Sequence, residues 1–85
     1  MLNTTTLVQL YSQYCNQSSV TLEIAPQNFV GVVCSGFMMK LFVDFVVDQG
    51  YTVEQIEEWE RNTFEDEGAD RFFEDVERSF QQLEV

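Results

Sequence analysis

The residues best suited to chemistry in this chain are carboxylates, and they are concentrated in its second half. Residues 44–85 hold fourteen of the fifteen acidic residues and three of the four basic ones, so this half carries the whole net charge of −11. Many of these acids recur three or four residues apart, a spacing that places side chains on one face of a helix. Ten of them are the candidate binding residues, called the acidic face below: Glu54, Glu57, Glu58, Glu60, Glu65, Asp66, Glu67, Asp70, Glu74 and Asp75.

Such an array could imitate nucleic acid. Because a helix rises about 1.5 Å per residue, carboxylates four residues apart are separated by about 6 Å along its axis. Duplex DNA carries about one charge per 1.7 Å of axis, a density that one helix cannot match. Two packed helices joined by the expected loop Glu65–Glu67 could approximate part of one groove edge. The alternative is a solvated surface that keeps a small protein soluble.

Catalytic chemistry has little support in the sequence. The chain has no His, which excludes a Cys/His metal site and a histidine base. Cys34-Ser35-Gly36 stands at an expected strand-to-helix junction and resembles a nucleophile position. No partner base and no glycine-rich oxyanion motif accompany it. We therefore expect neither an enzyme nor a bound cofactor.

A calcium loop can be aligned on Gly68, but the match is poor. With Gly68 at the sixth position, Thr63, Glu65, Glu67 and Glu74 take the first, third, fifth and twelfth. The first position lacks the usual Asp, and the next two ligands carry the longer Glu. The pattern predicts loose screening by divalent cations and no defined metal site.

Length and composition indicate a single folded domain, 1–85, with a neutral scaffold half, 1–43, and an acidic helical half, 44–85. An aromatic content of 14% argues against disorder. The two cysteines, Cys15 and Cys34, form no CxxC motif and are expected to be free thiols. No basic segment followed by an apolar run opens the chain, so we expect a cytoplasmic protein.

The apolar run Phe29–Val47 is long enough to raise the question of a membrane span. Glycines, serine and the charged residues Lys40 and Asp44 interrupt it, however. Charges at such positions are costly in a bilayer. We therefore expect no association with a membrane.

The first half predicts a helix followed by a β-hairpin. Apolar residues recur at helical spacing over residues 4–15, with Asn3 or a following Thr as the cap. Residues 20–24 alternate between apolar and polar, which is typical of a half-buried strand. Residues 29–34 are β-branched and apolar on both faces, and Pro26 begins the turn before them. The short connection favours an antiparallel pair.

The second half predicts three helices. Residues 37–47 read as a buried central helix between Ser35 and Gly50, with Lys40, Asp44 and Asp48 as its solvent-facing stripe and Lys40–Asp44 as an ion pair. Thr52 and Gln55 predict a capping box for the next helix, and Asp70 starts the last one. The adjacent Phe72 and Phe73 cannot both face the core. The expected order is α-β-β-α-α-α, a small α+β fold.

An acidic, ordered half on a small neutral scaffold resembles the DNA-mimic inhibitors of phages, such as anti-CRISPR and anti-restriction proteins. The resemblance is one of class and includes no diagnostic motif. It implies an inhibitor that blocks the nucleic-acid cleft of a basic partner, a nuclease or a CRISPR or restriction component, without binding nucleic acid itself. The alternative is a generic interaction or dimerisation module with a solubilising acidic surface, in which residues 37–47 contribute to the contact. Either a monomer or a homodimer fits the sequence.

Overall fold

The computed structural model describes residues 2–17 and 24–83, and 88% of these residues are helical, with no strand among them. The expected α+β fold is therefore wrong. Five α-helices and one π-helical segment follow in order: α1 (Thr4–Gln17), α2 (Pro26–Cys34), α3 (Gly36–Asp48), α4 (Val53–Arg61), η1 (Asn62–Glu67) and α5 (Gly68–Leu83).

The second strand of the expected hairpin is a helix. Pro26 stands at the start of α2, where a missing N–H costs nothing, so the residue expected to open a turn begins a helix instead. Phe29 and Val32 are buried one turn apart, and Gly31 lies exposed on the opposite side. Burial on one helical face outweighs the β preference of the valines. The first expected strand, 20–24, lies almost wholly outside the described residues, and Ile24 is exposed without regular structure.

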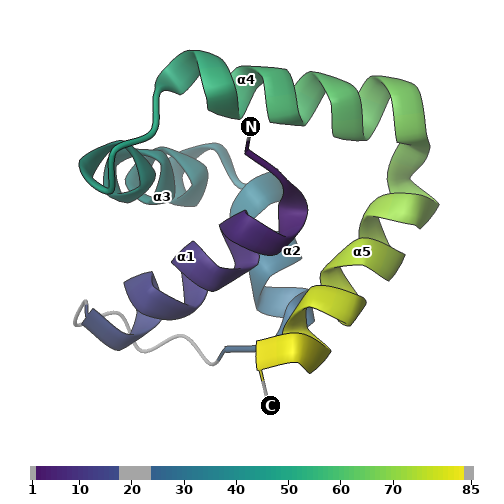
Figure 1. Ribbon diagram of the computed structural model, residues 1–85, viewed down its shortest axis with the longest axis horizontal. Helices are drawn as coiled ribbons and strands as arrows, with labels where there is room; N and C mark the ends of the chain where they lie inside the picture. Colours follow the sequence, from purple (N-terminus) through teal and green to yellow (C-terminus); the bar gives the residue numbers. More distant parts are fainter. Residues whose placement is uncertain (1, 18–23, 84–85) are drawn as a thin grey trace.

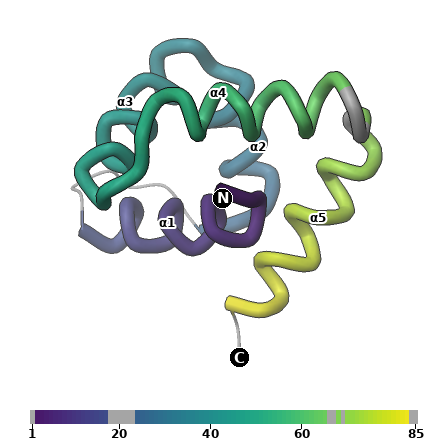
Figure 2. Tube along the Cα trace, turned by 45° about the horizontal axis from the view of Figure 1, so that its top comes forward, coloured from purple at the N-terminus to yellow at the C-terminus, as the bar shows by residue number. Residues whose placement is uncertain are grey.

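The helices enclose one shared core. Figure 1 shows α3 and α5 at opposite ends of the molecule, with α4 running between them along the top. Figure 2, viewed from another direction, also shows α3 and α5 apart from each other. α1 packs most extensively against α5 and also touches α3, and α2 packs against α3 and α5. The first two helices therefore connect the two ends.

Tyr11 lies at the centre of this core. Its ring meets those of Phe29, Phe42 and Phe80 edge-on, with centroids 5.4, 5.9 and 6.3 Å away. These partners come from α2, α3 and α5, so a single side chain of α1 contacts three other helices. Edge-to-face packing is the arrangement that aromatic rings favour.

The helix starts predicted from the sequence are mostly confirmed. Asn3 caps α1, because its side-chain oxygen accepts from the Thr6 N–H at 2.8 Å. The Thr52–Gln55 capping box of α4 is complete in both directions. Gly50 follows α3 with a φ of 104°, a left-handed conformation that favours glycine.

The expected loop between the last two helices is also wrong. η1 continues α4 in a wider π-helical turn, which buries Thr63 and packs Phe64 on Phe72 with 5.0 Å between centroids. Gly68, with a φ of 79°, then redirects the backbone into α5. Asp70 lies in the first turn of α5, as expected.

Among the described residues, no single helix is both long and apolar enough to cross a membrane. α2 and α3 reach that length and composition only as a pair, and they are bent by 102° where they meet.

Candidate functional site

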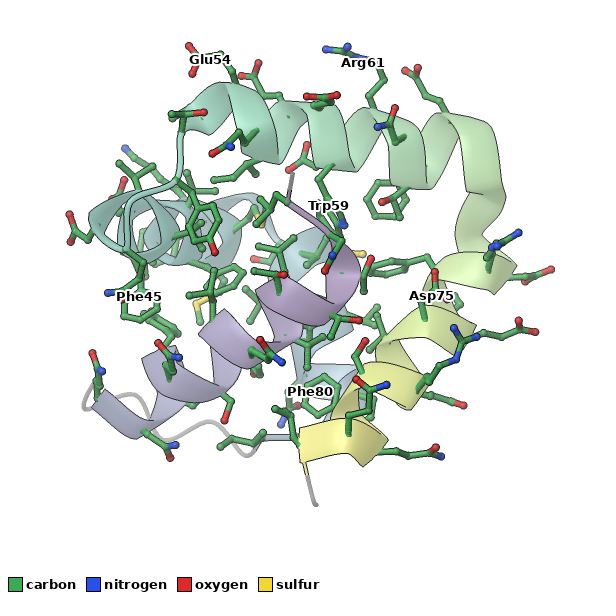
Figure 3. The ribbon with its side chains drawn as sticks, in the orientation of Figure 1. Phe45, Glu54, Trp59, Arg61, Asp75 and Phe80 are labelled. Carbon is green, nitrogen blue, oxygen red and sulfur yellow. The ribbon has the colours of Figure 1, made fainter. Side chains whose placement is uncertain are left out.

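The acidic face begins on the outer side of α4. Glu54, Glu57 and Glu58 are exposed, and Figure 3 shows Glu54 and Arg61 pointing away from the core along the upper edge. The inner side of this helix buries Ile56 and Trp59. Because the helix is amphipathic, burial of its inner side leaves these carboxylates exposed to solvent.

Glu60 differs from the other acids of α4 because it is half-buried. Burial raises the pKa of its carboxyl, and the nearby charge of Glu57 raises it further. Ionised Glu60 thus carries a cost that a cation placed beside it would relieve. Among the described acids of α4, Glu60 is the one whose ionised form is disfavoured by burial.

On α5 the structure keeps most of the predicted residues together and separates one. Asp70 and Glu74 are exposed, as is Glu65 on η1. Asp75 is half-buried, and its carboxylate forms an ion pair of 3.4 Å with Arg78. Arg78 therefore partly screens the charge of Asp75, which distinguishes it from the exposed acids of α5. The side chains of Asp66 and Glu67 lie outside the described part.

Glu77 is not among the ten residues predicted for the acidic face. It is exposed on α5, three residues after Glu74 and seven after Asp70, so all three share one helical face. That spacing was the signal that could have found it.

The two acidic helices do not lie side by side. Each packs against η1, while direct contact between α4 and α5 is slight. Figure 1 shows that the chain turns a corner at η1, so the carboxylates follow α4 along one edge and α5 along the next. The prediction of two packed helices and a loop is corrected to an angled rim.

Two exposed aromatic rings accompany this rim. Phe64 is 42% exposed and lines a hollow of about 290 Å³ with Glu57, Glu60, Arg61 and Glu65. A ring beside carboxylates suits a cationic side chain, which can meet a negative charge and a π-face together.

The second ring is Phe73, which is 46% exposed, whereas its neighbour Phe72 is buried. Phe73 and Glu77 line a groove of about 280 Å³ against Pro26 and Val30 of α2. The expectation that only one of the two adjacent phenylalanines faces the core is thus confirmed.

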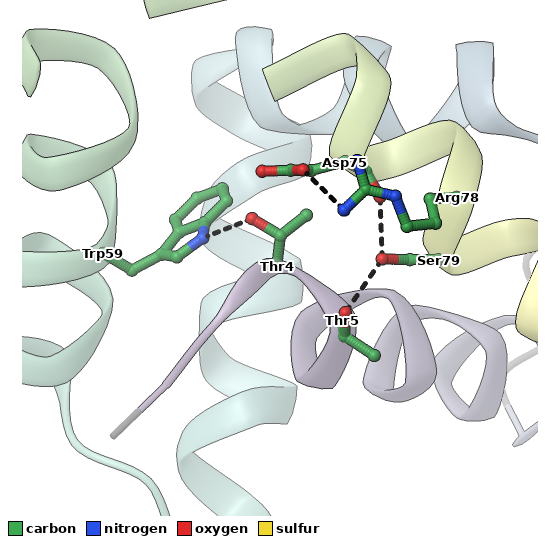
Figure 4. Close-up of polar contacts among 6 residues, drawn as sticks. All are labelled: Thr4, Thr5, Trp59, Asp75, Arg78 and Ser79. Carbon is green, nitrogen blue, oxygen red and sulfur yellow. Dashed lines mark hydrogen bonds and ion pairs between the residues drawn. The ribbon is translucent and has the colours of Figure 1, made fainter. Parts of the chain in front are cut away.

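A further hollow, about 460 Å³, lies where α1, α4 and α5 meet. Figure 4 shows its polar groups bonded to one another: the Trp59 indole N–H donates to the Thr4 hydroxyl at 3.0 Å, and the Thr5 and Ser79 hydroxyls are 3.0 Å apart. The Ser79 hydroxyl also lies 2.8 Å from the Asp75 carbonyl, to which it donates. Because these groups satisfy each other, we assign them a structural role in joining α1 to α4 and α5.

The segment that aligns poorly with a calcium loop is helical in the structure. Thr63, at its first position, is buried within η1, and Glu74 lies well inside α5. In the parts of the chain that the structure describes, no group of three or more acidic or cysteine side chains could hold a metal ion. Cys34 is exposed at a junction between two helices, so the expected strand-to-helix junction is wrong.

No protein-family model matches this chain, and no curated protein or solved structure is significantly similar to it. The case for function therefore rests on the geometry of the acidic face itself.

Proposed function

We propose that this protein is an acidic inhibitor that binds the nucleic-acid cleft of a basic protein, such as a nuclease or a CRISPR or restriction component, in place of DNA. The observation that supports this most directly is the angled rim of exposed carboxylates on α4, η1 and α5. The rim is ordered, since these helices bury Trp59, Phe72 and Val76 on their inner sides.

Charge complementarity would provide fast association. A patch of one sign raises the encounter rate with a patch of the opposite sign, and added salt lowers it. Selectivity would come from Phe64 and Phe73, which stand beside the carboxylates and can fill apolar recesses in a partner. The hollow at Phe64 would take a Lys or Arg side chain next to Glu60.

A competition assay tests this proposal. A panel of restriction and CRISPR nucleases is mixed with labelled duplex DNA, and DNA binding is measured with and without this protein at low and moderate salt. We expect at least one nuclease to lose DNA binding, and the loss to weaken as salt rises. If every nuclease that binds this protein still binds DNA fully, the DNA-mimic proposal is wrong.

Matched charge reversals separate an ordered site from bulk charge. Glu58→Lys and Glu74→Lys change the acidic face, whereas Asp48→Lys makes the same change in net charge on α3, outside the acidic face. We expect each rim variant to lower affinity at least tenfold and Asp48→Lys to lower it less than threefold. Equal losses would mean that total charge matters and the rim does not.

A further inference from the structure

One face of α3 exposes apolar side chains at helical spacing. Phe37 is 73% exposed, and Leu41 and Val47 follow one and nearly three turns later at 38% and 39%. The opposite face buries Phe42 and Val46 in the core. α3 therefore presents a second stripe, in which these apolar side chains lie beside Lys40, Asp44 and Asp48, and the described part of the chain leaves it uncovered.

The charges on this stripe differ from those on the rest of the surface. Lys40, the single basic residue of the first half, and Asp44 are both exposed on α3. Although four residues apart, they form no ion pair within the described residues, contrary to expectation. α3 also lies at the end of the molecule away from α5 (Figure 1). A second copy of this negative molecule therefore meets less repulsion at α3, with one basic and two acidic residues, than at the acidic helices α4 and α5.

The sequence of α3 allows this helix to pair with an antiparallel second copy of itself. Lys40 and Asp44 stand two residues before and after Phe42, and Phe37 and Val47 stand five before and after it. In an antiparallel pair related by a two-fold axis level with Phe42, each Lys40 comes level with Asp44 of the second copy. Each Phe37 comes level with Val47 of the second copy, about 7.5 Å from the axis. One axis brings both pairs level, and because residues ten apart point about 80° from each other around a helix, Phe37 and Val47 flank the ion pairs on either side.

We propose that the exposed face of α3 is a self-association surface, on which a second copy of this chain binds antiparallel about that axis. The interface combines exposed apolar side chains with two ion pairs. Each contact occurs twice about the axis, as an isologous interface requires. It does not depend on the proposed function, because the acidic rim on α4 and α5 stays uncovered in the pair. A single helix pair is a small interface, so the association is of the weak, reversible class.

A lipid surface fits this stripe less well. The bend of 102° prevents α2 and α3 from forming one straight span, and Asp44 and Asp48 interrupt the apolar stripe at its centre and end. The chain also carries a net charge of −11, which anionic headgroups repel. A second copy, unlike a lipid, offers a partner for both Lys40 and Asp44.

Sedimentation equilibrium with a charge-swap cycle tests the proposal. In a reducing buffer near physiological salt, we expect the wild-type chain to form dimers over roughly 10–200 µM, the range for weak interfaces. Lys40→Asp and Asp44→Lys should each weaken dimerisation about tenfold, because like charges then meet across the axis. The double variant K40D/D44K should restore the wild-type dimerisation.

Phe37→Ser tests the apolar contribution, and Phe73→Ser, which changes another exposed ring on α5, is its control. We expect Phe37→Ser to weaken dimerisation more than tenfold and Phe73→Ser to leave it unchanged, with circular dichroism reporting that each variant is folded. A wild-type chain that stays monomeric throughout would overturn the proposal, as would a double variant that remains as weak as the single ones. Binding to neutral phosphatidylcholine vesicles that Phe37→Ser abolishes would assign the stripe to lipid and overturn it too.

Discussion

The indole nitrogen of Trp59 donates a hydrogen bond of 3.0 Å to the hydroxyl of Thr4. Trp59 is buried on the inner side of α4, and Thr4 is the first residue of α1. The bond therefore joins the helix that carries half of the acidic rim to the start of the chain, 55 residues earlier. It also satisfies an N–H that would otherwise be buried without a partner.

Thr4→Val is expected to destabilise the fold by about 1–2 kcal/mol, because it keeps the shape of the side chain and leaves the buried indole N–H unpaired. Urea unfolding followed by Trp59 fluorescence measures the change, since this is the chain's single tryptophan. Thr6→Val is the control on the same helical turn. Equal losses in the two variants would show that replacing a hydroxyl near the helix start, and not the loss of the bond to Trp59, is responsible.

Tyr11→Phe is expected to stabilise the protein by about 1 kcal/mol, since a buried hydroxyl without a partner carries a desolvation cost. The Tyr11 hydroxyl is buried and has no hydrogen bond of ordinary geometry, and its nearest polar neighbour is the Cys15 thiol, a weak partner. Burial accordingly raises the pKa of Tyr11 well above its usual range. Thermal unfolding of Tyr11→Phe, beside the half-buried Tyr51→Phe, measures the gain. A lower melting temperature for Tyr11→Phe would contradict this reading.

Glu60→Gln is expected to raise stability at neutral pH and to have little effect at acid pH. Burial and Glu57 raise the pKa of Glu60, so the folded state holds a proton at pH values where the unfolded state has lost it. The cost of ionising Glu60 is absent below its unfolded pKa of about 4.3, grows as the pH rises and is complete above the folded pKa.

Urea unfolding of Glu60→Gln and wild type at pH 4 and pH 7 measures this difference. Glu58→Gln removes the same charge from an exposed position of the same helix. A gain in Glu60→Gln that is as large at pH 4 as at pH 7 would rule out an electrostatic origin.

Thr52→Ala is expected to cost about 1 kcal/mol, since the Thr52 hydroxyl accepts the Gln55 N–H at 3.2 Å and begins α4. The loss should fall on α4 and spare α1. Hydrogen exchange measures this: amides of the first turn of α4 should exchange faster, whereas those of α1 should not. Uniform acceleration across both helices would contradict a local capping role.

The parts of the fold that the sequence predicted are those fixed by local chemistry. The capping box of Thr52 and Gln55 depends on residues three apart, and it formed as expected. Gly50 ends α3 because a left-handed backbone favours glycine. These features need no knowledge of the distant chain.

The failure at Phe29–Cys34 has a different cause. Five of these six residues are apolar, so their pattern fits a buried strand and a buried helix equally. What decides is the place of Phe29 among the rings of Tyr11 and Phe80, which come from distant segments. Pro26 fits the first turn of a helix as well as it fits the loop predicted from the sequence.

The exposure of several acidic residues could be predicted from the sequence, but the shape of the surface that they form could not. Exposure of Glu54, Glu57 and Glu58 follows from helical spacing alone. The corner at η1 does not, because it depends on Phe64 packing against Phe72 and Trp59. The ion pair between Asp75 and Arg78 could have been predicted, because residues three apart are within reach of each other on a helix.

The packing of α1 against α5 also constrains when the molecule can fold. Thr5 and Ser79, whose hydroxyls meet, are separated by 74 residues, and Tyr11 needs Phe80 to complete its aromatic cluster. Closing such a long loop comes late, because its entropy must be overcome before distant contacts form. On the ribosome, the core therefore stays open until the residues of α5 have emerged and can pack against α1.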